Sequence, residues 1–197
     1  MNIVRLEVGQ MQANCYLVSN NSEAVIIDPG DDADYIIQKI QDEELVPVAI
    51  LATHGHFDHI MGALTLQLAF SIPFYINSND MFLVQKMRYS ARHFLKTDPG
   101  PPAETVFLGE KFATANLEFS VIPFPGHTPG SVCFYNAKEK AVFVGDLIFA
   151  DEYVGRTDFS YSDKNKMRES IDKIMKLPKD TIVYPGHGEE FTLSSRA

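Results

Sequence analysis

The sequence predicts an α/β fold in which helices cover the faces of β-sheets. Short segments rich in β-branched and aromatic residues alternate with segments of helical periodicity in both halves of the 197 residues. Apolar residues make up 45% and charged residues 22%, which is typical of a globular protein and excludes a disordered or collagen-like one. Because the length is close to that of one domain of about 150 residues, we expect residues 1–197 to form a single domain.

The first third of the chain is expected to contain three strands and a helix. The strands are short, β-branched segments separated by Gly, Asn and Ser: Asn2–Val8, Asn14–Val18 and Ala24–Ile27. The turn residues Asp28-Pro29-Gly30 end the third strand. A helix follows, because Asp31 or Asp32 can cap it and four residues form one apolar face, namely Ala33, Ile36, Ile37 and Ile40.

The middle of the chain predicts two strands and two helices. The continuous apolar run Val48–Ala52 is typical of a strand that is buried on both faces, and Phe74–Ile76 is a second short strand. Between them a helix from His59 to about Ala69 would turn three residues inward: Ile60, Leu64 and Leu68. Another helix is expected from Ser78 to about Leu95. We interpret the Met- and aromatic-rich segment Ser78–Pro102 as a helix packed on the core, with a flap over a site as the alternative.

The last third predicts a second group of strands and one more helix. The strands are expected at Leu117–Ile122, Ser131–Tyr135, Ala141–Val144 and Ile182–Tyr184. The helix is expected over Lys164–Leu177, where Met167, Ile171, Ile174 and Met175 form one stripe.

Charge and cysteine content exclude several functions. The formal net charge is -9, and the absence of a basic run argues against nucleic-acid binding. Cys15 and Cys133 lie in apolar surroundings without CxxC spacing, so we expect reduced thiols and a cytoplasmic location. The first residues lack the pattern of a signal peptide, and no run approaches about 18 apolar residues. We therefore expect neither a nucleic-acid nor a membrane partner.

The strongest motif is His54-Gly55-His56-Phe57-Asp58-His59, which directly follows a buried strand. A tight loop allows His54 and His56 to point to one side and Asp58 and His59 to the other, so that one cluster could serve two metal ions. The alternative is a polar turn in which Asp58 caps a helix. That interpretation leaves three clustered histidines without a role, and we therefore favour metal binding.

Three further ligand-type residues follow later strands and are flanked by glycine: His127, Asp146 and His187. Each alone would more often be an ordinary surface residue. Together with the first motif they make five histidines and two aspartates at strand ends, where open α/β sheets bind ligands. This donor set suits Zn, Fe or Mn, and it is sufficient for two ions if Asp146 bridges them. We expect two divalent ions, with zinc favoured over iron or manganese. They would activate a water for attack on a carbonyl.

These motifs, taken in order, resemble the signature of the metallo-β-lactamase superfamily. The resemblance runs from about residue 10 to 188 and rests on His54-x-His56-x-Asp58-His59, Gly126-His127-Thr128, Gly145-Asp146 and Pro185-Gly186-His187-Gly188. It implies an αββα sandwich of two mixed β-sheets flanked by helices. It also implies that His54, His56 and His127 hold the first metal, that Asp58, His59 and His187 hold the second, and that Asp146 bridges them.

Within that superfamily, the run Gly155-Arg156-Thr157-Asp158 is similar to one in the short glyoxalase II-like hydrolases. The resemblance implies hydrolysis of a thioester or a related small ester by a metal-bridging hydroxide, with Asp58 and Asp146 as catalytic residues. The C-terminal helical domain that binds glutathione in full-length glyoxalase II is not expected. The alternatives are a mononuclear-iron oxidoreductase similar to persulfide dioxygenases and a non-enzymatic binding module.

Three other polar residues have narrower expected roles. The resemblance implies that Asp28 supports a metal-ligand loop through hydrogen bonds, although a simple turn carboxylate is the alternative. Arg156 and Asp158 are expected to form a structural ion pair. His93 lies outside the ligand pattern and is expected at the surface.

Overall fold

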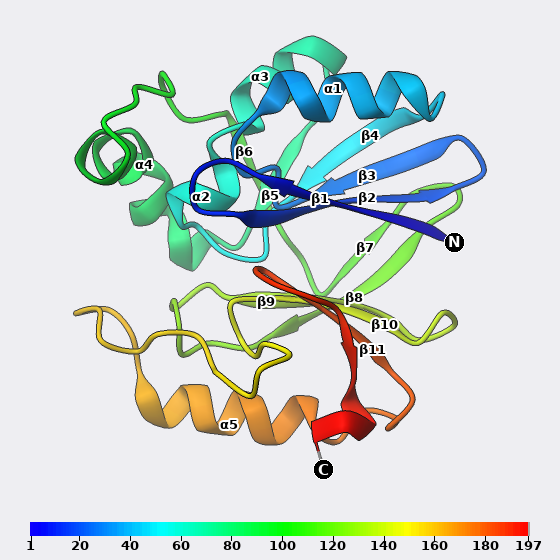
Figure 1. The fold of residues 1–197 in the computed structure, drawn as a ribbon, viewed down its shortest axis with the longest axis vertical. Coiled ribbons are helices and arrows are strands. Elements are labelled where there is room, and N and C mark those ends of the chain that lie inside the picture. The colour runs from blue at the N-terminus through cyan, green and yellow to red at the C-terminus, as the bar shows by residue number, and fades with distance from the viewer. Residues whose placement is uncertain (197) are drawn as a thin grey trace.

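The computed structural model describes residues 1–196, and its four layers run helix, sheet, sheet, helix (Figure 1). Two six-stranded mixed sheets pack face to face, and helices cover both outer faces. This arrangement confirms the αββα sandwich that the sequence resemblance implies.

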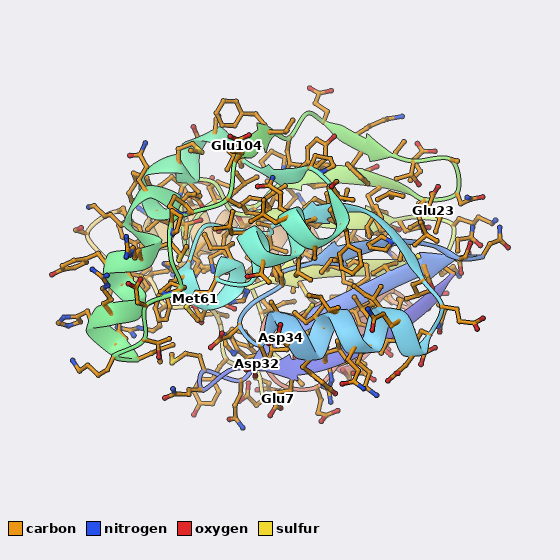
Figure 2. The ribbon with its side chains drawn as sticks, turned by 90° about the horizontal axis from the view of Figure 1, so that it is seen from above. Glu7, Glu23, Asp32, Asp34, Met61 and Glu104 are labelled. Carbon is orange, nitrogen blue, oxygen red and sulfur yellow. The ribbon has the colours of Figure 1, made fainter. Side chains whose placement is uncertain are left out.

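The first sheet is built from the N-terminal half in the order β1-β2-β3-β4-β5-β6. Its first three strands pair antiparallel and the following strands pair parallel. The strands are β1 (Asn2–Val8), β2 (Ala13–Asn20), β3 (Glu23–Ile27), β4 (Val46–Leu51), β5 (Phe74–Ile76) and β6 (Thr105–Phe107). The helical segments between them are α1 (Ala33–Asp42), α2 (Phe57–Ile60), α3 (Ala63–Phe70), η1 (Ser78–Asp80) and α4 (Met81–Phe94). Figure 2 shows α1 and α3 lying across the outer face of this sheet.

The second sheet is built from the C-terminal half in the order β12-β11-β10-β9-β8-β7. Its one parallel pair, β10 and β11, is joined by a crossover that contains α5 (Lys164–Ile174), and this helix covers the outer face (Figure 1). The strands are β7 (Lys111–Ala113), β8 (Glu118–Pro123), β9 (Val132–Asn136), β10 (Ala141–Gly145), β11 (Ile182–Pro185) and β12 (Phe191–Thr192), and η2 (Leu193–Arg196) follows them.

Three apolar clusters fill the three spaces between the four layers. Alternation along the strands divides the side chains between them, because successive side chains of a strand point to opposite faces. In β2, Cys15 and Leu17 pack under the first helices, whereas Tyr16 and Val18 pack between the sheets. In β10, Phe143 lies between the sheets and its neighbours face α5.

The prediction of one helix from His59 to about Ala69 is wrong about where the helix begins and about its being continuous. The structure has two short helices, α2 and α3, with a break at Met61 and Gly62. Gly62 lies against the preceding turn, where its N–H donates to the Gly30 carbonyl and an added Cβ would lie 3.2 Å from the Pro29 carbonyl oxygen. In α3, Leu66 is buried, whereas Leu68, which was expected inside, is 71% exposed.

Smaller differences have local causes. Asp32 lies at the N-cap position of α1 but does not cap it, because its carboxylate accepts from the Gly9 N–H instead. The helix predicted to end at Leu177 ends at Ile174. The strands β6, β7 and β12 were not predicted. Each is short and lies at the edge of its sheet, where pairing with a single neighbour defines it.

Two negative expectations can be compared with the described residues. Cys15 and Cys133 are both buried and free, as expected. Within residues 1–196, the helices are too short or too polar to cross a lipid bilayer.

Candidate metal centre

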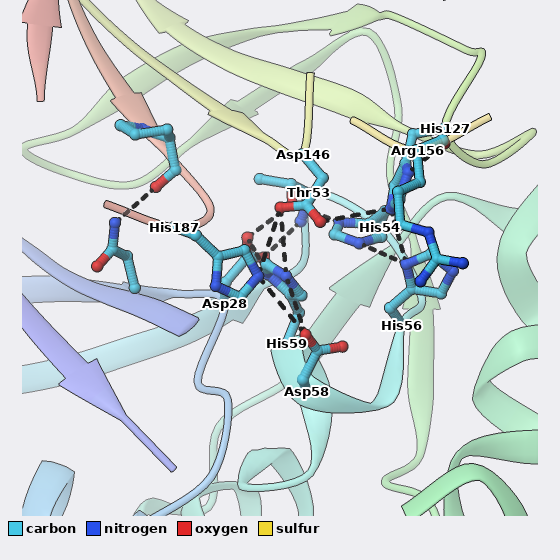
Figure 3. Close-up of polar contacts among 12 residues, drawn as sticks. Asp28, Thr53, His54, His56, Asp58, His59, His127, Asp146, Arg156 and His187 are labelled. Atoms are coloured by element: carbon cyan, nitrogen blue, oxygen red, sulfur yellow. Dashed lines mark hydrogen bonds and ion pairs between the residues drawn. The ribbon is translucent and has the colours of Figure 1, made fainter. Parts of the chain in front are cut away.

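The structure brings all seven predicted ligands together at one edge of the sandwich (Figure 3). The loop after β4 carries His54, His56, Asp58 and His59. The loops after β8, β10 and β11 carry His127, Asp146 and His187. Both sheets therefore supply the site, and each contributes side chains from the ends of its strands.

The first ligand group contains three imidazoles whose inner nitrogens nearly touch. His56 Nδ1 lies 3.0 Å from His54 Nε2 and 2.8 Å from His127 Nε2. Asp146 adds a carboxylate oxygen, Oδ2, 3.5 Å from His127 Nε2. The four ligand atoms lie within 4.8 Å of one another, which is the spacing of donors around one ion.

The second ligand group lies on the other side of Asp146. Asp58 Oδ2 lies 3.8 Å from His59 Nε2 and 3.6 Å from His187 Nε2. The other oxygen of Asp146, Oδ1, lies 3.5 Å from His59 Nε2 and 3.7 Å from His187 Nε2. Asp146 thus directs one oxygen to each group, which is the geometry of a bridging carboxylate.

Outer hydrogen-bond partners orient three of the histidine rings. The carbonyl oxygens of Arg156 and Gln12 accept from His127 Nδ1 at 2.8 Å and from His187 Nδ1 at 3.0 Å. The carboxylate of Asp28 accepts from His59 Nδ1 at 3.1 Å. Because each acceptor holds the proton on Nδ1, the neutral form of each ring keeps a lone pair on Nε2, directed at the centre.

Asp28 also orients the first histidine through Thr53. The backbone N–H of Thr53 donates to Asp28 Oδ1 at 2.7 Å, and the Thr53 hydroxyl donates to Oδ2 at 2.6 Å. With its proton given to Asp28, the hydroxyl oxygen accepts from His54 Nδ1, 3.1 Å away. One buried carboxylate therefore aligns a histidine in each ligand group, in agreement with the supporting role expected for Asp28.

The two groups differ in their electrostatics. Burial and the surrounding imidazoles lower the pKa of His54 well below its ordinary value, and they lower that of His56 to about 3. Burial would also lower the pKa of His59, but the carboxylates of Asp146, Asp58 and Asp28 outweigh it and raise this pKa to about 10. His54 and His56 of the first group are therefore neutral imidazoles, whereas His59 of the second group stabilises a positive charge.

The residues present fit a pair of divalent cations. His59 Nε2 and Asp146 Oδ1 are buried without a hydrogen-bond partner, although buried polar atoms are nearly always paired. Both atoms lie in the second ligand group, where a cation would satisfy them. Imidazole nitrogens and carboxylate oxygens are the donors that Zn, Fe and Mn accept in proteins.

Asp80 is a structural part of the site that the sequence analysis did not identify. Its carboxylate is fully buried and accepts from Gly55 N at 2.9 Å, from Gly130 N at 2.7 Å and from the Thr128 hydroxyl at 2.7 Å. These donors lie in the loops that carry His56 and His127. Asp80 therefore fixes the distance between two loops that meet at the first ligand group.

Tyr161 is a second residue that the motifs did not indicate. Its hydroxyl lies 2.8 Å from His56 Nε2, on the side of the ring away from the other ligands. It lies 105 positions away from His56 in the sequence, in a loop without a recognisable motif. No local signal could have identified it.

Two minor predictions agree with the structure. Arg156 and Asp158 form a bidentate ion pair with distances of 2.9 and 2.8 Å, and both side chains are exposed. His93 is exposed on α4, where its ring stacks on Tyr89.

An open pocket of about 410 Å³ lies directly beside the centre. Its floor includes His56, Asp58, His127, Asp146 and His187. Leu83, Ser90 and Phe94 of α4 form part of its wall. Leu83 is also buried, together with three other residues of α4: Val84, Met87 and Ala91. The segment Ser78–Pro102 thus contains a helix packed on the core, as favoured, and one side of this helix borders the pocket.

Gly186→Ala is expected to lower kcat/KM by about 10²-fold, because small displacements of reacting groups are costly. A Cβ at this position would overlap Asp146 Oδ1 and would lie 2.8 Å from His59 Cε1. Bound metal per chain and kcat/KM would be measured beside Gly109→Ala, which has open space around its added methyl. Full metal content and unchanged activity in Gly186→Ala would contradict the bridging position of Asp146.

Comparison with known proteins gives a consistent result. The family model described as metallo-beta-lactamase superfamily matches residues 8–187. The chain is 34% identical to hydroxyacylglutathione hydrolase GloC of Haemophilus influenzae, covering 98% of this chain and 93% of that one. Among solved structures, BLEG-1 B3 metallo-beta-lactamase is 35% identical with a TM-score of 0.91, covering 99% of this chain and 96% of the other. TTHA1623 in a di-iron-bound form is 36% identical with a TM-score of 0.90, covering 98% and 96%.

Proposed function

The chain belongs to the metallo-beta-lactamase superfamily, and from this membership we propose that it is a dinuclear metal-dependent hydrolase of a thioester or a related small ester. The observation that carries the proposal is Asp146, whose two oxygens face two complete ligand groups. The relative from Haemophilus influenzae that is named as a hydrolase supports the reaction class. That the substrate is a thioester or a related small ester is part of the proposal.

Each residue of the centre has a definite task in this reaction. His54, His56 and His127 would hold the first ion, Asp58, His59 and His187 the second, and Asp146 both. When bound, the ions supply the Lewis acidity that polarises a carbonyl and lowers the pKa of water toward about 7. Burial would raise the pKa of Asp58, but His59 and His187 outweigh it and lower that pKa. Asp58 therefore stays ionised and can accept a hydrogen bond from the attacking water, which orients it.

We propose zinc as the metal, with iron and manganese as the alternatives that the donor set also suits. The di-iron form named for TTHA1623 belongs to that protein and makes iron the first alternative to test. The free thiols of Cys15 and Cys133 support a reducing compartment, and we propose the cytoplasm. The partner we propose is a small molecule and not a nucleic acid or a membrane, because the net charge of -9 repels anionic surfaces.

The proposal predicts about two metal ions per chain and thioester hydrolysis by the loaded protein. Elemental analysis would be combined with a hydrolysis panel on Zn-, Fe- and Mn-loaded protein. The panel holds S-D-lactoylglutathione, simple thioesters, lactones and, because of the BLEG-1 neighbour, a β-lactam. A fully loaded, active preparation with one ion per chain would refute the dinuclear mechanism. Oxygen uptake with glutathione persulfide would favour the mononuclear-iron oxidoreductase instead, and no turnover at all would favour a binding module.

A further inference from the structure

We propose that the pocket selects substrates whose non-reacting part is an uncharged, apolar group, carried on either the acyl or the thiol side. This inference rests on the proposed thioester hydrolysis and names the substrate class within it. Its basis is the lining of the pocket of about 410 Å³ beside the metal centre. The rim, the wall and the charge of this pocket each contribute a separate argument.

The rim of the pocket consists of exposed apolar side chains from separate segments. Met11 lies in the β1–β2 turn, Phe94 ends α4, and Val154 lies in the loop after β10. Their exposed fractions are 45%, 64% and 44%, respectively. Single exposed apolar residues are common, but several that converge on one cavity indicate an apolar ligand. These three residues are called the apolar rim below.

The wall continues the apolar surface from the rim to the ligand histidines. The rings of Phe57 and Phe94 stack with centroids 5.7 Å apart and an angle of 4°. Deeper in the pocket, Phe159 lies 5.1 Å from the ring of His56 and 5.8 Å from that of His127, measured between centroids. A group that extends from the reacting carbonyl toward the rim would therefore contact aromatic carbon along its length.

The charges of the pocket disfavour an anionic group. Among the described residues that line it, Arg156 is the one Lys or Arg side chain. The Nε and Nη2 groups of its guanidinium donate to Asp158, and its Cζ lies 4.7 Å above the ring of Phe159. A carboxylate of the substrate would meet a guanidinium whose charge Asp158 already offsets, so its desolvation would be poorly compensated. Glutathione has two carboxylates and one ammonium group, and beyond the metal centre the described lining offers its carboxylates one guanidinium, whose charge Asp158 already offsets.

The test compares four thioesters in a two-by-two design. Lactoyl and hexanoyl groups are each placed on glutathione and on uncharged N-acetylcysteamine, and kcat/KM is measured with the metal-loaded protein. We expect kcat/KM for hexanoyl-N-acetylcysteamine to exceed that for lactoylglutathione by about tenfold or more. Each added methylene that an apolar pocket binds raises kcat/KM by at least about that factor. The two mixed thioesters show whether the acyl or the thiol side occupies the apolar rim.

Variants of the apolar rim connect the preference to these residues. Phe94→Lys and Met11→Ser are expected to lower the ratio of hexanoyl-N-acetylcysteamine to lactoylglutathione by about tenfold, because they place polar groups beside the bound chain. Leu68→Ser is the matched control, since Leu68 is exposed on α3 and does not line the pocket. Because the ratio compares kcat/KM for two substrates of the same preparation, a partial loss of folded protein does not change it.

Different results would contradict the apolar substrate class and the thioester hydrolysis on which it rests. Equal or higher kcat/KM for lactoylglutathione would overturn the apolar substrate class and leave the hydrolase intact. A preference unchanged in both Phe94→Lys and Met11→Ser would also overturn it. If none of the four thioesters is cleaved by any metal form, the proposed thioester hydrolysis is itself refuted.

Discussion

Asp146→Asn is expected to lose bound metal from both halves of the centre and to lower kcat/KM on the order of 10³-fold. The two oxygens of Asp146 lie 3.5 Å from His127 Nε2 and 3.5 Å from His59 Nε2, one in each ligand group. The amide keeps the volume but carries no negative charge, and its nitrogen cannot bind a cation. The substitution thus leaves one neutral oxygen for two ions, so that one ion loses a ligand and the other is held more weakly.

The measurements for Asp146→Asn are metal per chain and kcat/KM for the best substrate of the panel. Asp172→Asn is the matched control, because Asp172 is exposed on α5 and the change in net charge is the same. Two bound ions and near-normal activity in Asp146→Asn would show that the carboxylate does not bridge. Loss of one ion alone would show that the amide oxygen still holds the other.

Asp28→Asn is expected to destabilise the metal-free fold by about 3 kcal/mol, because it places a donor where two donors converge. Asp28 is 1% exposed, and its Oδ2 accepts from the Thr53 hydroxyl and from His59 Nδ1. An amide nitrogen in place of Oδ2 would face both hydrogens. Asn suits this test better than Ala, because the residue has a φ of 51°, which Asn tolerates at lower cost.

Urea unfolding of chelator-treated protein would measure this loss separately from any effect of metal. Asp34→Asn, on the exposed face of α1, is the matched control. The metal-loaded Asp28→Asn protein should in addition bind its ions about 10–100-fold more weakly, because supporting hydrogen bonds orient the ligands. A free energy of unfolding within about 0.5 kcal/mol of the wild type would contradict this network.

The sequence was sufficient to predict the candidate ligands, because their signal is local. Four of them lie in the six residues His54–His59. Each of the other three directly follows a glycine, just beyond an apolar run. Strand ends at one edge of a sheet place such residues together without any knowledge of distant contacts. The alternation of strand and helix patterns predicted helices on the faces of sheets, and the family resemblance implied the four layers of the sandwich.

The supporting residues could not be predicted, because their roles arise from contacts between distant segments. Asp80 resembles an ordinary helix cap in the sequence, and only the packing of α4 brings it to Gly55 and Gly130. The break at Gly62 depends in the same way on the turn at Pro29. Leu68 continues the predicted apolar stripe in the sequence, but the structure exposes it to solvent. Local periodicity carries no information about such steric and hydrogen-bonding constraints.

The division of ligands between the sheets has a consequence for folding. Each ligand group combines histidines from the loop after β4 with a residue from a loop of the second sheet, either His127 or His187. The two ions would therefore act as cross-links between halves of the chain that otherwise meet mainly through side-chain packing. Their binding free energy would add to that of folding, and neither half could unfold without releasing metal. The metal centre would thereby also couple the two halves, so that the sandwich unfolds as one cooperative unit.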